Sequence, residues 1–348
     1  MRVARRRLIL LSLPLLVAAA PLPPVPAYRS FGQWVVGCDN TRSCEARGFD
    51  EPQQVDMRVL RGAGDAGARI VLMTADVPEN GTVHVDGRAL HLAAPAWVRH
   101  GGDPSDPARL STDDPTAIRV FLAAVRNGHV LQLGGPDAPT IPLDGLRATL
   151  LFIDAVQARP GTTSPLVAPA GTGQAPPAPP LPRPPSWLPP TPLTPAETLA
   201  LVAQAKRLPF PHDETRDRTE DVEIHALDAA SALAIRPCVL YAYQGSALVH
   251  VLPRKGGGPA VPVVLPLPGM SRDGETVAGP SMISPEFDPK TGRLAVTEEA
   301  RGPGDCGLVA EWAWGAAAFH MTSLRFLDRC GDVEPGDFPT LYRSAGGG

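Results

Sequence analysis

A proline-rich segment divides the chain, and this division constrains the fold more than any other feature of the sequence. Residues 160–193 are dense in proline, alanine, glycine and threonine, with runs such as Ala175–Pro180. Proline fixes φ and removes the backbone N–H donor, so this composition favours an extended, solvated and semi-rigid linker. A proline motif that binds the groove of a partner is the alternative interpretation. We predict an N-terminal domain over residues 28–159 and a C-terminal domain over residues 194–343.

The first residues are typical of an export signal. Arg2 and Arg5–Arg7 form a basic region, and the apolar run Leu8–Ala20 is too short to span a bilayer. Val25–Ala27 supplies small residues in front of a cleavage point. We therefore predict a signal peptide over residues 1–27, general secretory export, and a mature chain without a transmembrane segment. An uncleaved anchor and twin-arginine export are the alternatives.

The charge of the chain limits its partners. The formal net charge at pH 7 is −4, and it becomes more negative once the four arginines of the signal are removed. Nucleic acids and anionic membranes require clustered positive charge, so neither is an expected partner. The expected partner is an unidentified component of the cell envelope, either a protein or a glycan.

Five cysteines bear on the compartment and on stability. In an oxidising compartment cysteines form disulfides, and the odd number leaves one over. Cys38 and Cys44 are predicted to pair because the residues between them favour a turn. Cys306 and Cys330 are predicted to pair across a hairpin. Cys238 follows a proline at the start of an apolar strand and is predicted to be a buried free thiol, although it could instead replace one partner of the second pair.

Apolar patterns predict strands and two helices in the N-terminal domain. Val55–Val59 alternates as a half-buried strand does, Ile70–Met73 is typical of a central strand, and Thr82–Leu92 indicates a hairpin. A helix is expected after the cap residue Asp114. Leu146–Val156 is apolar nearly all round, which predicts a buried helix. The sheet should be mostly antiparallel.

The C-terminal domain is predicted to begin with a helix and to continue in short strands. Thr194–Glu197 has the pattern of a capping box. Hairpins are expected around Gln244–Gly245 and Asp288–Gly292, and later strands carry Trp312 and Trp314. The predicted fold class of the whole chain is α+β, with two domains dominated by short antiparallel strands, a few helices and a proline-rich linker.

Several motifs resemble nucleotide-binding or metal-binding sites, but each is better explained as an ordinary loop, strand or hairpin. Gly62–Gly67 matches G-x-G-x-x-G, but a strand follows it where a dinucleotide site needs a helix. His84 and His91 lie on opposite arms of the predicted hairpin, without an evident third metal ligand. The acidic stretch Asp213–Asp221 lacks the central glycine and final glutamate of a calcium loop. No cofactor-binding or metal-binding residue is predicted.

The features that could indicate a catalytic or binding site also have structural explanations. Cys306 has a glycine-rich surrounding and would act as a nucleophile only beside a histidine, so the disulfide is favoured. The G-x-S-x-G elbow of serine hydrolases is missing from the sequence. Trp312 and Trp314 could form an exposed binding platform, although aromatic residues at alternating positions are more often core. No catalytic residue is predicted, and a non-enzymatic role is favoured.

The opening stretch Phe31–Cys44 resembles that of a family of exported bacterial proteins known as DUF1176, a domain of unknown function. The likeness continues through Leu143–Ala148 and Ile153–Arg159 and returns in Gly302–Gly307. The N-terminal domain is also similar to invasion-associated locus B proteins. Both resemblances imply a periplasmic or envelope role, the second also implies surface interaction, and neither implies a reaction.

Together these observations predict an exported protein, periplasmic or secreted, that binds or supports another component of the cell envelope. Two alternatives stay open. One is a hydrolase that acts on cell-wall or surface material, and the other is a periplasmic inhibitor of a lytic enzyme.

Overall fold

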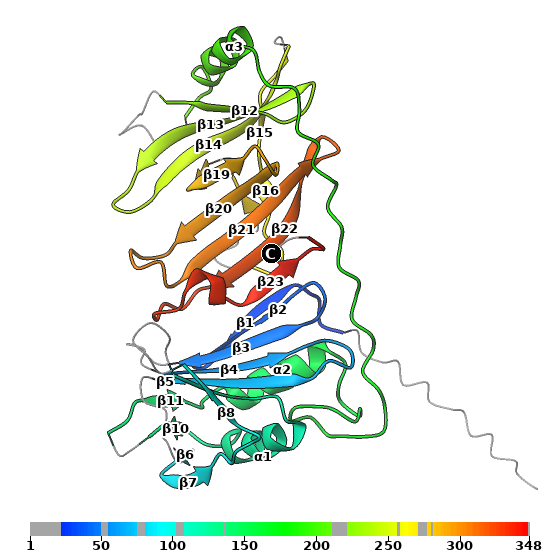
Figure 1. Cartoon of the computed structure of the whole chain (residues 1–348), viewed down its shortest axis with the longest axis vertical. Coiled ribbons are helices and arrows are strands. Elements are labelled where there is room, and N and C mark those ends of the chain that lie inside the picture. The colour runs from blue at the N-terminus through cyan, green and yellow to red at the C-terminus, as the bar shows by residue number, and fades with distance from the viewer. Residues whose placement is uncertain are drawn as a thin grey trace, which may run out of the picture.

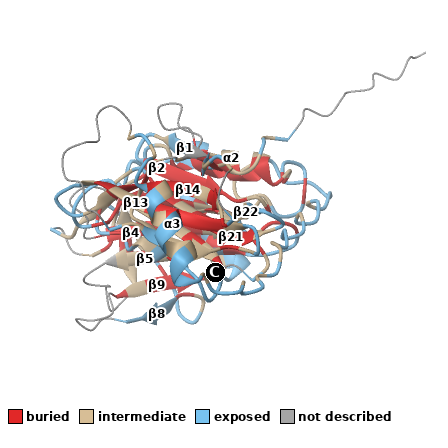
Figure 2. Cartoon of the chain, turned by 90° about the horizontal axis from the view of Figure 1, so that it is seen from above, coloured by how far each residue is buried: buried red, intermediate tan, exposed pale blue. Residues whose placement is uncertain are grey.

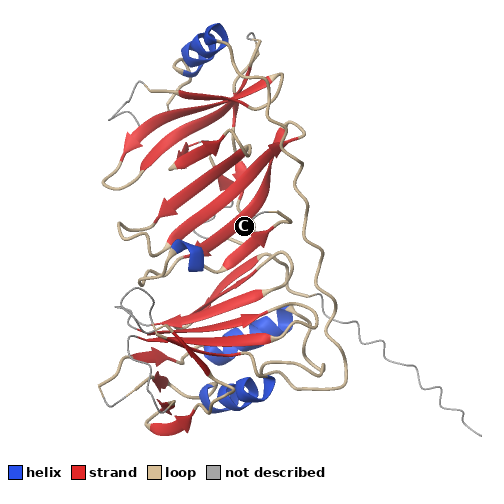
Figure 3. Cartoon of the chain, viewed as in Figure 1, coloured by secondary structure: helices blue, strands red, loops and turns tan. Residues whose placement is uncertain are grey.

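The structure of the chain is a computed structural model. Within its 348 residues it describes 22–49, 55–74, 81–101, 108–134, 137–210, 221–255, 258–270, 277–279 and 281–346. In these ranges the chain consists mostly of antiparallel strands in several sheets, with three α-helices (Figures 1 and 3). The strand-rich character predicted from the sequence is therefore confirmed. Most of the predicted signal peptide and of the acidic stretch lies outside the described residues.

Seven strands form the first sheet, and every neighbouring pair is antiparallel. Their order is β1-β2-β3-β4-β5-β9-β8. The bounds are β1 Ala27–Phe31, β2 Trp34–Cys38, β3 Cys44–Phe49, β4 Val55–Arg61, β5 Ala68–Thr74, β8 Val98–His100 and β9 Arg109–Thr112. The Gly62–Gly67 motif joins β4 to β5, so a strand follows it, as predicted. Cys38 and Cys44 lie opposite each other on β2 and β3 and form the predicted disulfide.

A smaller sheet has the strand order β11-β10-β6-β7. Its bounds are β6 Thr82–Val85, β7 Arg88–His91, β10 Val130–Gln132 and β11 Thr140–Pro142. Asp86 and Gly87 form the turn between β6 and β7, with φ values of 49° and 78°. Two consecutive positive φ values match the twist of a two-residue hairpin turn. Asn, Asp and Gly are the residues that adopt such φ values most readily. The predicted hairpin is therefore present.

Two helices pack beside these sheets (Figure 1). They are α1, Pro115–Val125, and α2, Leu146–Val156. The carboxylate of Asp114 accepts a 2.7 Å hydrogen bond from the backbone N–H of Ala117, which confirms the predicted cap of α1. The predicted helix α2 is present and is buried along one side, but Leu151 on the other side is 41% exposed. The helix packs against one face of the first sheet, and its opposite side stays open.

The third helix and three further sheets follow the proline-rich segment. Helix α3, Pro195–Ala205, begins with the predicted capping box between Thr194 and Glu197. One sheet contains β12 Glu223–Ala226, β13 Ser231–Leu240, β14 Gly245–Pro253, β15 Val261–Pro262 and β18 Ser281–Ile283. A two-stranded sheet pairs β16 Leu265–Pro266 with β17 Val277–Ala278. The last sheet runs in sequence order through β19 Pro285–Asp288, β20 Arg293–Glu299, β21 Gly307–Gly315, β22 Ala318–Leu327 and β23 Thr340–Arg343.

The sheets stack along the long axis of the molecule in an order that differs from the sequence. The first sheet lies nearer one end, α3 lies at the other, and β19–β23 lie between them (Figure 1). Strand β23 lies against β2. A Cβ added to Gly37 of β2 would lie 2.8 Å from the Cβ of Pro339, so glycine permits this close approach. Figure 2 shows the buried residues gathered in the stacked sheets and exposed residues on α3 and the connecting loops.

No named helix or strand occurs in residues 160–193, and this segment runs along one side of the stack (Figure 1). Its two ends contact the sheets. The carboxylate of Asp154 on α2 accepts hydrogen bonds from the backbone N–H groups of Leu166, Val167 and Ala168. Trp187 packs against the apolar cluster of the C-terminal strands. None of the helices in the described ranges is both long and apolar enough to cross a membrane.

Candidate functional site

Charged side chains cross the middle of one face of the first sheet. Side chains alternate between faces along a strand, so the pairing register sets which residues share a face. Arg47 of β3 lies opposite Arg58 of β4. Val71 of β5 lies between Arg58 and Ser111 of β9. Neighbouring rows add Phe49, Asp56, Leu60, Arg69, Met73, His100 and Arg109. We call this face of the sheet the arginine face.

The C-terminal strands cover one half of the arginine face, over β1, β2 and β3. Tyr28, Val35 and Phe49 belong to the same apolar cluster as Leu341 of β23. The hydroxyl of Tyr28 donates a 2.7 Å hydrogen bond to Asp328. Burial, together with the charge of Asp328, raises the pKa of Tyr28. This half of the face is therefore an interior surface.

An ion network marks the border of the covered half. Arg47 is 1% exposed, and its Nη1 lies 3.0 Å from Oδ2 of Asp56. The guanidinium of Arg58 donates to the same carboxylate oxygen at 3.2 Å and to Asp337 at 2.7 Å. Asp337 belongs to the short 3-10 helix η1, Pro335–Asp337, just before β23. The network therefore ties β3 and β4 to the C-terminal segment.

Burial and charge shift the pKa values within this network. Burial lowers the pKa of Arg47 and raises that of Glu45, whose carboxylate lies 3.9 Å from Arg47. Burial also opposes the charge of Arg58, but the hydrogen bond to Asp337 and the nearby carboxylates outweigh it and raise the pKa of Arg58. The hydrogen bond from Arg58 lowers the pKa of Asp337. Arg58 thus favours the ionised form of Asp337.

The other half of the arginine face is open and forms a cavity of about 330 Å³. Its described lining comes from β4, β5, β8, β9 and η1, and consists of Arg58, Leu60, Arg69, Val71, Met73, His100, Arg109, Ser111 and Asp337. Ser111 is 5% exposed. Its Oγ accepts a 3.2 Å hydrogen bond from Arg69 and lies 3.2 Å from Nε2 of His100. A buried hydroxyl therefore links an arginine and a histidine at this opening.

A second cavity, of about 450 Å³, adjoins the first, and Leu60 lines both. Its described charged lining consists of Asp39, Glu45, Arg61, Arg325 and Arg343. Arg343 forms an ion pair with the buried carboxylate of Asp39. Burial and the charge of Arg159 lower the pKa of Arg61 to about 10. This second cavity lies between the first sheet and the C-terminal strands β22 and β23.

The lining of the two cavities is positively charged overall. Among the described lining residues, arginines outnumber acids by six to three. Asp39 pairs with Arg343, Asp337 pairs with Arg58, and burial raises the pKa of Glu45. The chain as a whole carries a formal charge of −4. The arginine face is therefore a local exception on an acidic protein.

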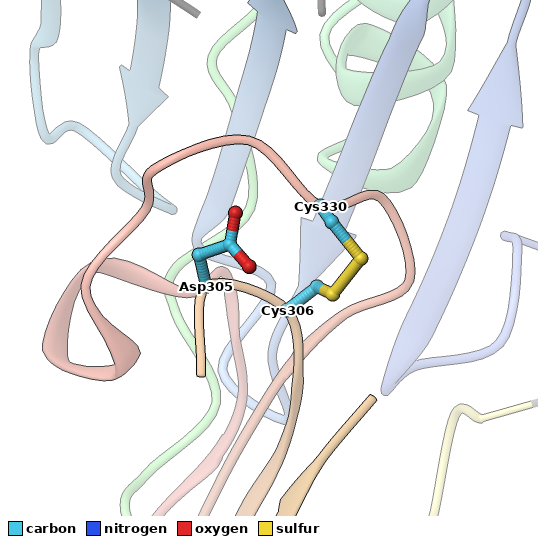
Figure 4. A group of neighbouring side chains, drawn as sticks. All are labelled: Asp305, Cys306 and Cys330. Atoms are coloured by element: carbon cyan, nitrogen blue, oxygen red, sulfur yellow. A yellow bond between two sulfur atoms is a disulfide. The ribbon is translucent and has the colours of Figure 1, made fainter. Parts of the chain in front are cut away.

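A second cluster of potential ligand atoms surrounds the C-terminal disulfide (Figure 4). The carboxylate of Asp305 and the sulfurs of Cys306 and Cys330 lie within 4.8 Å of one another. The two sulfurs are joined in the predicted disulfide, so neither is available as a thiolate ligand or nucleophile. Asp305 accepts 2.7 Å hydrogen bonds from Arg301 Nε and from the backbone N–H of Asp332.

These contacts give Asp305 a structural role. The hydrogen bond from Arg301, despite opposing burial, lowers the pKa of Asp305 to about 2. Its carboxylate ties the loop before β21 to the loop after β22, where the disulfide also joins them. The thiol-hydrolase interpretation of Cys306 therefore has no support in the structure.

The remaining residues singled out in the sequence are dispersed. Trp312 is fully buried and Trp314 is 5% exposed, so the core interpretation is correct and the exposed platform is wrong. His84 lies opposite Ala89, and neither it nor His91 joins a metal-ligating group within the described part of the chain. Cys238 is buried on β13 and lies outside both disulfides.

Sequence reasoning missed the arginine face. The signal was present in part, because Arg58 occupies an outward position in the alternating run of β4 and Arg69 directly precedes the predicted strand Ile70–Met73, whereas no strand was predicted at Arg109, the first residue of β9. Alternation identifies the face of one strand at a time. Only the pairing register brings arginines from four strands together.

A family model described as "Protein of unknown function (DUF1176)" matches residues 28–345. The chain belongs to this family. This DUF1176 protein is also similar to the uncharacterised protein YpfG of Escherichia coli (strain K12), with 30% identity over 97% of this chain and 99% of that protein. No solved structure matches the chain. The resemblance to DUF1176 is confirmed, and the resemblance to invasion-associated locus B proteins stays a prediction.

Proposed function

We propose that this DUF1176 protein is exported and binds a component of the cell envelope through the open half of the arginine face, without catalysing a reaction. The single observation that carries the proposal is the pair of adjoining cavities lined by arginines. An exposed surface that carries several arginine side chains is a typical binding surface for a negatively charged ligand.

The compartment rests on separate observations. The basic and apolar residues 1–20 have the pattern of a signal peptide, and two disulfides are typical of proteins in oxidising compartments. Fractionation of cells by osmotic shock should release the chain with the periplasmic proteins. N-terminal sequencing should find Tyr28 as the first residue. Recovery of the uncleaved chain in the cytoplasm would contradict export.

Binding is tested by affinity capture from envelope extract. Mature protein on a resin should retain a defined envelope protein or glycan, which mass spectrometry and sugar composition then identify. The Arg69→Gln variant should retain less, while Arg88→Gln, which changes an exposed arginine on β7, should retain as much as the native chain. Equal retention by all three proteins would contradict binding at the arginine face.

The absence of catalysis has its own test. Purified protein is incubated with peptidoglycan, and the release of soluble fragments is followed by chromatography. No release above a buffer control is expected. Turnover by the native chain would replace this proposal with the hydrolase alternative, and inhibition of an added lytic enzyme would replace it with the inhibitor alternative.

We also propose that residues 28–159 and 194–343 are two domains joined by the linker 160–193. The absence of named helices and strands from that segment supports this division. Limited proteolysis should cut first between about residues 160 and 193 and leave two resistant fragments. Because Val35 and Phe49 share a cluster with the C-terminal strands, the fragments should remain associated after the cut. Cleavage throughout both regions would contradict the division.

A further inference from the structure

We infer that the cavity over β4, β5 and β9 binds an oxyanion, namely a phosphate or carboxylate group carried by an extended polyanionic ligand. This inference rests on the proposed binding function and adds the chemistry of the ligand. Five features of the described residues lead to it.

The first feature is the geometry of the donors. Arg69 and Ser111 are joined by a 3.2 Å hydrogen bond, and His100 contacts the same hydroxyl at 3.2 Å. A guanidinium presents N–H donors in a planar fork that matches two oxygens of a phosphate or carboxylate. The contact to Ser111 holds one donor of Arg69 and restricts the side chain, while its other N–H groups remain available at the exposed edge.

The second feature is that the neighbouring acids are already engaged. Asp56 is bonded to both Arg47 and Arg58, and Asp337 is bonded to Arg58. These contacts cancel the charges of the two carboxylates. No carboxylate in the described part of the chain forms an ion pair with Arg69, so its charge is available to an incoming anion.

The third feature is a second guanidinium at the same opening. Arg109 lies opposite both Met73 and His100 in the strand register, so it stands on the same face as Arg69. Arg109 also lines the same cavity as Arg69. A site lined by two arginines favours an anion over a neutral sugar or peptide.

The fourth feature is the continuity of the two cavities. Leu60 lines both, so Arg325 and Arg343 lie in the cavity next to the one that Arg69 lines. The guanidinium of Arg325 has no hydrogen-bond partner among the residues that the structure describes. A chain that carries anionic groups at intervals can therefore contact both cavities, and a single small anion can contact only one.

The fifth feature is the contrast with the rest of the protein. The formal net charge of −4 repels polyanions at long range. Polyanion binding must therefore come from a local cationic site, and its strength should fall with added salt because the charges lie at the surface. This contrast makes the inference testable with simple polymers.

The experiment measures binding of the mature chain to three polymers by isothermal titration calorimetry at low salt. The probes are inorganic polyphosphate, polygalacturonate as a carboxylate chain, and dextran as a neutral glycan. Binding of at least one polyanion, with none to dextran, is expected. Stronger binding of polyphosphate assigns the site to phosphate, and stronger binding of polygalacturonate assigns it to carboxylate. Failure of both polyanions to bind overturns the inference.

Variants locate the site. Arg69→Gln should weaken polyanion binding at least tenfold, and Arg325→Gln should weaken polyphosphate more than orthophosphate. Arg88→Gln is the matched control and should leave binding unchanged, with circular dichroism confirming the fold of each variant. Equal weakening by Arg69→Gln and Arg88→Gln would overturn the assignment to this cavity. Envelope capture without polyanion binding would overturn this inference alone, and polyanion binding without envelope capture would overturn only the proposed function.

Discussion

The two faces of the first sheet come from the same strands and have opposite chemistry. Toward α2, side chains such as Trp34, Met57 and Ile70 are completely buried in one apolar cluster. Toward the C-terminal strands, the alternate positions carry Arg47, Arg58 and Arg69. The first face is buried across β2–β5, whereas the second is closed only over β1–β3. The difference shows that strand alternation can place an apolar core on one side of a sheet and charged side chains on the other.

The largest expected effect tests the closed face. Trp34 is fully buried, and its Nε1 donates a 3.0 Å hydrogen bond to the carbonyl of Pro142. Trp34→Ala removes this bond and leaves a cavity, so the free energy of unfolding should fall by about 3–5 kcal/mol. Urea unfolding followed by circular dichroism measures the loss. A loss below about 1 kcal/mol would show that the closed face is not the main source of stability.

One disulfide lies at the face of the first sheet that packs against α2, and the other lies in the C-terminal region that covers part of the arginine face. Removing each in turn therefore compares the two regions. Cys38–Cys44 lies in the cluster beneath α2 and closes a sequence separation of 6, whereas Cys306–Cys330 closes one of 24. The chain-entropy estimate is about 2 kcal/mol for the short loop and about 3.5 kcal/mol for the long one. Paired Cys→Ser variants should therefore lose more stability at the second bridge, as urea midpoints will show. The reverse order would contradict the entropic account.

The next effect tests the border of the covered half. Arg47→Ala removes the ion pair with Asp56 and the hydrogen bond to the carbonyl of Asp337 at 3.1 Å. Loss of one partner from a buried pair leaves the other charge poorly solvated, so the expected cost is about 3 kcal/mol. Arg88→Ala on exposed β7 is the control and should cost almost nothing. Similar costs at both positions would show that the network adds no stability.

The smallest effect is a pH dependence confined to the arginine face. The folded pKa of Asp337 lies below its ordinary value because of Arg58. Its contribution to stability is therefore complete above about pH 4 and is lost as the pH falls through the lowered pKa. Glu45 has a raised pKa, so its contribution acts in the opposite direction and is lost as the pH rises through that value.

The Asp337→Asn variant separates the two groups. It should be less stable than the native chain at neutral pH, and the difference should shrink as the pH is lowered through the folded pKa of Asp337. Thermal unfolding measured in a series of buffers provides the comparison. A difference that stays constant with pH would mean that the ion pair with Arg58 contributes no net stability.

Local features of the sequence predicted most of the elements. The cap at Asp114, the capping box at Thr194 and the turn at Asp86–Gly87 each depend on residues that lie next to one another, and each is present. The Cys38–Cys44 bridge joins directly opposed residues of one hairpin, so it also follows from a local turn. These predictions are correct because each depends only on residues that are close in sequence and not on the position of a distant segment.

Features that depend on distant segments were not predicted. Arg47 and Arg58 lie directly opposite each other, an arrangement that is unfavourable for like charges unless an acid intervenes. Asp56 supplies that acid, but its role becomes visible only when the strands are paired. The exposed side of α2 has the same origin, because Leu151 is apolar and only the position of the sheet decides which side of the helix is covered.

The return of β23 to β2 has a consequence for the newly made polypeptide. A chain that leaves a ribosome or an export channel N-terminus first can form β1–β5 early, since these strands are neighbours in sequence. Val35 and Phe49 must then wait for Leu341 before they are shielded from water. Throughout that interval the nascent sheet offers an apolar patch that a chaperone can hold. A truncated product that lacks β23 therefore lacks the contact of Leu341 with this patch.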